Sequence, residues 1–175
     1  MLLVVSACKQ AEVASATAPE PAKPASAGCG SGGFLKASIY GAISASLDWA
    51  GQRLNCAGMP RPNGQGARLR FAGSVNDHPI AIIIAMPGLT RASAGAELAS
   101  NVTLIEEGNG RFYSTVDLDV CLTQIESMEA IDDGGDRYSV GGSVYCVSPL
   151  AEVNGDSSVS LSELTFTGLL DWNAS

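Results

Sequence analysis

Residues 35–47 read LKASIYGAISASL, and this stretch decides the fold class. Its odd-numbered positions are apolar or glycine, whereas its even-numbered positions include Lys36, Ser38, Ser44 and Ser46. A period of two places the apolar side chains on one face of an extended chain. The stretch therefore predicts a strand with one buried face.

The same alternation recurs at residues 67–71, at residues 138–146 and, near the C-terminus, at residues 164–172. Residues 80–86 form a continuous apolar run between two prolines, which is consistent with a strand buried on both faces. Residues 102–105 and 112–116 flank the turn sequence EGNG and predict a hairpin.

Helical periodicity is weak throughout, and only residues 92–100 could form one or two helical turns. Turn sequences rich in Gly and Asn separate the predicted strands. We therefore predict an all-β fold, a single β-sandwich or barrel-like domain of about eight or nine antiparallel strands after a disordered N-terminal tether.

Charge is unevenly distributed along the 175 residues, whose formal net charge is −8. Residues 1–96 hold eight Lys/Arg and four Asp/Glu, whereas residues 97–175 hold two Arg and fourteen Asp/Glu. The net charge argues against nucleic acid as a partner. The asymmetry has two explanations, which are that the halves pack in one domain and offset each other, or that the first half presents a basic binding face.

Residues 2–8, LLVVSAC, end in an aliphatic residue, two small residues and a cysteine. Val5-Ser6-Ala7-Cys8 resembles the lipobox of bacterial lipoproteins, although a basic region and most of an apolar region are missing before it. The resemblance implies that Cys8 is lipidated and that residues 1–7 are the remnant of a signal peptide whose true start lies upstream. Lys9 follows the cysteine where an Asp would retain the protein at the inner membrane, so the outer membrane is favoured.

Residues 8–28 comprise the lipidated Cys8 and a linker rich in Ala and Pro, which has too few large apolar side chains to fold. Residues 29–175 are then the β-sandwich domain. Four further cysteines remain in it, at Cys29, Cys56, Cys121 and Cys146, and an even number in an exported domain implies two disulfides. Three pairings are open, and we favour 29 with 56 and 121 with 146. The alternative is four free thiols in a reducing cytosol.

Arg68 and Arg70 lie on the same face of one predicted strand, roughly 7 Å apart. Such a fork could hold phosphate or carboxylate groups of anionic envelope polymers, although solvated or internally paired arginines would give the same pattern. The turn residues Asp132, Asp133 and Asp136 are weak calcium candidates. We otherwise predict no metal and no cofactor.

Residues 46–49 (SLDW) and 169–172 (LLDW) echo each other near the two ends of the domain. The echo predicts that Trp49 and Trp172 each cover one end of the core with the indole N–H bonded, and its alternative is a paired sugar platform. His78 is the only histidine and lies in a predicted turn, so a Ser-His-Asp site has little support.

Together these features predict a lipid-anchored cell-envelope protein with a non-enzymatic binding or structural role. The membrane is its first expected partner, through Cys8, and anionic polymers or other envelope proteins could be further ones. The rival hypothesis is an envelope hydrolase whose site is assembled from loops.

Overall fold

The computed structural model describes residues 28–30, 32–62 and 64–174. The predicted signal remnant, Cys8 and the linker up to residue 27 lie outside these residues. Within the described ranges, no helix has both the length and the apolar character needed to cross a membrane.

Eleven strands and two short 3₁₀ helices make up the domain, so the all-β prediction is confirmed. The elements are β1 (Phe34–Gly41), β2 (Ala45–Ala50), η1 (Gly51–Arg53), β3 (Asn55–Pro60), β4 (Ala67–Val75), β5 (His78–Met86), β6 (Glu97–Glu106), β7 (Arg111–Ser114), η2 (Leu118–Val120), β8 (Cys121–Ala130), β9 (Arg137–Cys146), β10 (Leu150–Glu152) and β11 (Ser158–Asp171).

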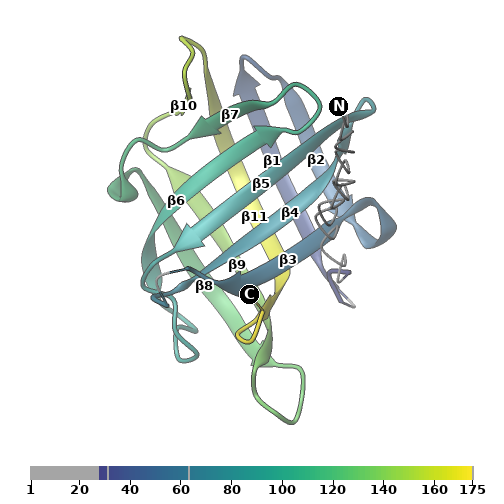
Figure 1. The fold of residues 1–175 in the computed structure, drawn as a ribbon, viewed down its shortest axis with the longest axis vertical. Coiled ribbons are helices and arrows are strands. Elements are labelled where there is room, and N and C mark those ends of the chain that lie inside the picture. The colour runs from purple at the N-terminus through teal and green to yellow at the C-terminus, as the bar shows by residue number, and fades with distance from the viewer. Residues whose placement is uncertain (1–27, 31, 63, 175) are drawn as a thin grey trace, which may run out of the picture.

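All strands belong to one antiparallel sheet that curls into two crossing layers (Figure 1). Strands β3, β4, β5 and β6 form one layer, and β2, β1, β11 and β9 form the other. The long strands β6 and β11 exchange partners along their length, so β8 joins the layers on one side and the short strands β7 and β10 join them on the other. The sheet is therefore sandwich-like in its layers and barrel-like in its curvature.

The core fills the space between the layers. Phe71 of β4 and Phe166 of β11 meet there with ring centroids 5.5 Å apart, and both side chains are buried. A Cβ atom added to Gly58 of β3 would lie 2.2 Å from the carbonyl oxygen of Leu169. This glycine therefore allows β3, an end strand of the sheet, to pack directly on the backbone of β11.

Residues 35–47 form two strands rather than the single strand that their alternation predicts. Strand β1 turns after Gly41, which has a φ of 107°, and β2 returns beside it with Ala37 opposite Leu47 and Ile39 opposite Ala45. In this register odd-numbered residues lie opposite odd-numbered residues, and opposed residues share a face. The period of two therefore continues through the turn, which is why the sequence pattern hides the hairpin.

Two further expectations need correction. The run at residues 80–86 is only partly buried on its outer side, where Ala81 is buried but Ile83 and Ala85 are half-buried. Ile80, Ile82 and Ile84 face the core. Residues 92–100 form no helix, since turns lead directly into β6. The predicted hairpin is present as β6 and β7, with Thr103 opposite Ser114.

Both disulfides are present in the favoured pairing. Cys29–Cys56 joins the start of the domain to β3, and the isolated bridge between Gly28 and Asn55 lies beside it. Cys121 and Cys146 lie opposite each other at the ends of β8 and β9.

Removing the bridge between β8 and β9 with the double substitution Cys121→Ala and Cys146→Ala is expected to lower the free energy of unfolding by about 3 kcal/mol, because the unfolded chain regains the freedom of a 25-residue loop. Equilibrium urea unfolding measures this loss. Peptide mapping of the unreduced native protein should also recover both linked pairs, and four alkylatable thiols would contradict the prediction.

Candidate functional site

The outer side of β3 to β7 carries apolar side chains where a solvent-facing antiparallel sheet usually carries polar ones. We call this surface the apolar outer face. Its apolar members are Ala57, Met59, Ala72, Ala81, Ile83, Ala85, Ala99, Ile105 and Phe112. Most of them are half-buried, whereas Ala81 is buried and Phe112 is exposed. Polar side chains share this side of the sheet, namely Arg68, Arg70, Asn101, Thr103 and Ser114.

The outer side of the opposite layer has a different composition, with serine and threonine at many outward positions of β1, β2, β9 and β11, beside charged residues and the exposed Tyr40 and Tyr145. Its hydroxyl side chains are Ser38, Ser46, Ser139, Ser143, Ser160, Ser162, Thr165 and Thr167. The two outer sheet faces thus differ in composition, because the aliphatic side chains of the apolar outer face have few counterparts on the other face.

Arg68 and Arg70 both project from β4 onto the apolar outer face. The strand register places Arg70 between Ala57 and Ile83, and Arg68 beside Met59. These five side chains line a groove of about 190 Å³. The predicted pair of arginines on one face is therefore present, and the other side chains that line the groove are apolar.

The two guanidinium groups have different partners. Arg70 forms an ion pair and hydrogen bond with Glu107 in the turn after β6. The Arg68 Nη2 atom lies 3.1 Å from the Met59 sulfur, and among the described residues no carboxylate lies within ion-pair distance of Arg68. Of the two arginines that the sequence predicts as possible anion ligands, Arg68 is thus the one without a carboxylate partner among the described residues.

Ion pairs also link the basic and acidic halves of the chain. Arg70 pairs with Glu107, and Arg91 Nη2 lies 2.7 Å from Asp136 Oδ1. The first explanation of the charge asymmetry is therefore supported, because the halves pack in one domain and these ion pairs offset some of their charge. The basic binding face stays a prediction.

A charged cluster around Arg111 of β7 lies on the core side of the sheet, next to the buried Tyr113. Arg111 Nε donates to Glu106 Oε2 at 2.6 Å, and Nη1 lies 4.0 Å from Glu152 Oε1 of β10. The hydrogen bond to Glu106 is the main cause that raises the pKa of Arg111. The cluster links β6, β7 and β10, and the charge of Arg111 is paired with carboxylates of the same domain.

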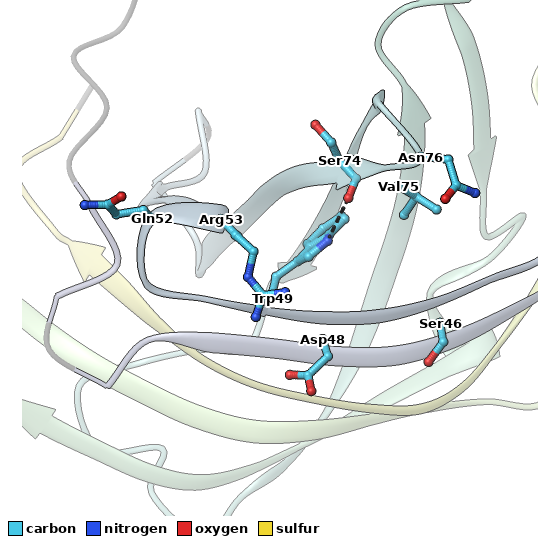
Figure 2. A pocket seen from close by; sticks show the side chains of 8 residues that line it. All are labelled: Ser46, Asp48, Trp49, Gln52, Arg53, Ser74, Val75 and Asn76. Atoms are coloured by element: carbon cyan, nitrogen blue, oxygen red, sulfur yellow. Dashed lines mark hydrogen bonds between the residues drawn. The ribbon is translucent and has the colours of Figure 1, made fainter.

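A pocket of about 520 Å³ lies between β2, η1 and the turn from β4 to β5 (Figure 2). The Trp49 indole N–H donates to the Ser74 carbonyl oxygen at 3.3 Å, as the sequence predicts. The Trp49 ring is only 4% exposed and packs against Gly73. It therefore covers the core and offers no free face on which a sugar could stack.

Trp172 lines a separate pocket of about 420 Å³. The Arg91 guanidinium carbon lies 5.3 Å from the centroid of its ring, whereas its buried indole N–H has no hydrogen-bond partner among the described residues. The expected partner for this N–H is thus not found. The two tryptophans line pockets that share no residue, so they do not form one sugar platform.

The other candidates remain dispersed. His78 is exposed at the start of β5, opposite Val75 and directly after the two-residue turn. The Asp132 carboxylate accepts the Asp136 backbone N–H at 3.3 Å, and Asp136 itself binds Arg91. Within the described ranges, no three His, Cys, Asp or Glu side chains come together as metal ligands would.

Comparison of the chain with protein-family models, with curated proteins and with solved structures finds no match. Its function is therefore inferred from its own residues and geometry. The apolar outer face is the feature that the sequence analysis did not predict. The signal for it was the unbroken apolar run at residues 80–86, whose outward members Ile83 and Ala85 are half-buried.

Proposed function

We propose that this protein is a lipid-anchored protein of the bacterial cell envelope, with a non-enzymatic role in binding an anionic envelope component. The observation that carries the proposal is the use of the cysteines. Two disulfides account for four of the five, which favours an oxidising compartment outside the cytosol. The fifth, Cys8, stands in the lipobox-like sequence.

The binding role is supported by the apolar outer face. Apolar side chains on an outer sheet face, where polar ones are usual, favour a contact with another molecule. Arg68 adds a positive charge that has no carboxylate partner among the described residues, in a chain whose net charge is −8. An anionic partner with apolar parts matches both properties.

Cys8→Ser is expected to release the protein from the membrane, because the acyl chains contribute most of the affinity and each buried methylene adds about 0.8 kcal/mol. The protein is expressed from its own chromosomal locus and separated by detergent-phase partitioning. Wild type should enter the detergent phase and Cys8→Ser the aqueous phase.

Ser6→Ala is the matched control for this anchor test, because it keeps a small residue in the lipobox-like sequence and should partition like wild type. If the wild type and Cys8→Ser divided equally between the phases, the anchor would be excluded.

A further inference from the structure

We propose that the apolar outer face docks directly on an anionic lipid leaflet, with the Arg68 guanidinium at the lipid phosphates and the side chains around it at the boundary with the acyl chains. The inference deepens the proposed function, since it names the anionic component as the lipid surface itself. Protein surfaces that combine apolar side chains with basic residues bind anionic lipid surfaces through burial of apolar area and through attraction to the lipid phosphates.

The apolar contribution comes from positions that the fold does not need. The side chains of Met59, Ile83 and Ile105 point away from the core and are each half-buried, and Phe112 extends the same surface at β7. The opposite layer carries Ser and Thr at many outward positions, and its exposed aromatic side chains, Tyr40 and Tyr145, each bear a hydroxyl group. The aliphatic and thioether side chains of the apolar outer face have few counterparts there.

The electrostatic contribution comes from Arg68. Its guanidinium lies against the Met59 sulfur, so the aliphatic stem covers apolar surface while the charged end stays at the solvent boundary. The neighbouring Arg70 is already neutralised by Glu107. The carboxylates near this face along the chain lie at its ends, at Glu97 where β6 begins and at Glu106 and Glu107 where β6 ends. Glu106 is paired with Arg111 and Glu107 with Arg70. The centre of the face is therefore basic.

The position of the linker fits this orientation. Gly28 bridges to Asn55, and the Cys29–Cys56 disulfide fixes the chain to β3, which is the outermost strand of the apolar outer face. The segment from Cys8 therefore joins the domain at the margin of the proposed docking surface. Twenty residues can span up to roughly 66 Å, which is ample for the domain to lie flat beside its anchor.

A second copy of the chain fits the same face less well. A two-fold contact is made by the same patch on both partners. It would place the Arg68 side chains of the two copies on one small interface, where like charges repel. Charge complementarity therefore favours an anionic surface over self-association.

The test uses the whole 175-residue chain with Cys8→Ser and both disulfides formed, so that binding is independent of acylation. Co-sedimentation with vesicles of phosphatidylglycerol and phosphatidylcholine in equal parts is compared with pure phosphatidylcholine vesicles at low salt. We expect binding to the anionic vesicles only. Arg68→Glu should weaken it roughly 25-fold, because each basic residue at such a surface contributes about fivefold and reversal acts twice.

Arg53→Glu is the matched control, since Arg53 is an exposed arginine that lines the pocket beside Trp49. It changes the net charge equally and should weaken binding less than about threefold. Met59→Ser should weaken vesicle binding while leaving binding to soluble polyphosphate unchanged. Thermal unfolding of each variant verifies that the domain remains folded.

Four results would overturn the docking proposal. Two concern vesicles: no preference for anionic vesicles, or an equal loss of vesicle binding with Arg53→Glu. The other two are equally tight Arg68-dependent binding to polyphosphate with no effect of Met59→Ser, and a dimer in sedimentation velocity that Met59→Ser dissociates. The anchor is judged separately by partitioning of the Cys8 variant. Vesicle binding without an anchor would reject the lipid anchor and keep the docking proposal. An anchor without vesicle binding would reject the docking proposal and keep the anchor.

Discussion

Replacing Phe71 with alanine is expected to lower the free energy of unfolding by about 3–5 kcal/mol, as for other fully buried aromatic side chains. The ring is buried between the two layers and contacts Phe166. It also packs on Gly168 of β11, where an added Cβ atom would lie 2.7 Å from the ring. Because the ring packs on the backbone of β11 at Gly168, no side chain on that side can move in to fill the cavity left by alanine.

Phe112→Ala provides the matched comparison for Phe71→Ala in equilibrium urea unfolding. Phe112 is 44% exposed on the apolar outer face, so its removal should reduce stability by less than about 1 kcal/mol. A similar loss for both variants would show that the core is not centred on the contact between β4 and β11.

Gly58→Val is expected to destabilise the domain by roughly 3 kcal/mol, at the upper end of overpacking effects. The new Cβ atom would meet the Leu169 carbonyl oxygen at 2.2 Å and the Leu170 Cα atom at 2.8 Å. Both contacts are with backbone, so relief requires β3 to move away from β11. Urea unfolding measures the loss, and hydrogen exchange should show it first in β3.

Gly134→Val tests whether the Gly58 effect comes from the contact or from the loss of a glycine. The nearest atom to a Cβ at Gly134 is an Asp132 carboxylate oxygen at 3.9 Å, in the loop between β8 and β9. Its stability should change by less than about 0.5 kcal/mol. If Gly58→Val were tolerated, the close approach of β3 to β11 would contribute little to the free energy of unfolding.

The fold class was predictable because period-two alternation depends only on neighbouring residues. The same property hid the first hairpin, since pairing Ile39 with Ala45 leaves the alternation unchanged through the turn. The disulfide between Cys121 and Cys146 was predictable because a separation of 25 residues returns one strand beside another. Local patterns thus identified elements and neighbours, but not where each chain reversal lies.

The candidate site was only partly predictable. Arg68 and Arg70 were placed on one face by strand parity alone, but the Arg70 partner, Glu107, is 37 residues away and depends on the registers of β4, β5 and β6. The apolar outer face likewise combines positions from five strands, none of which is unusual by itself. A sequence shows which residues alternate, whereas a surface depends on which strands lie side by side.

The bridge between Cys29 and Cys56 has a consequence for the lifetime of the protein. It closes residues 29–56 into a covalent ring that contains β1, β2 and η1. A single proteolytic cut inside this ring opens the chain without separating its two pieces, because the sulfur bridge still connects them. A nicked molecule would therefore keep its N-terminal segment attached and would be shed only after reduction or a second cut.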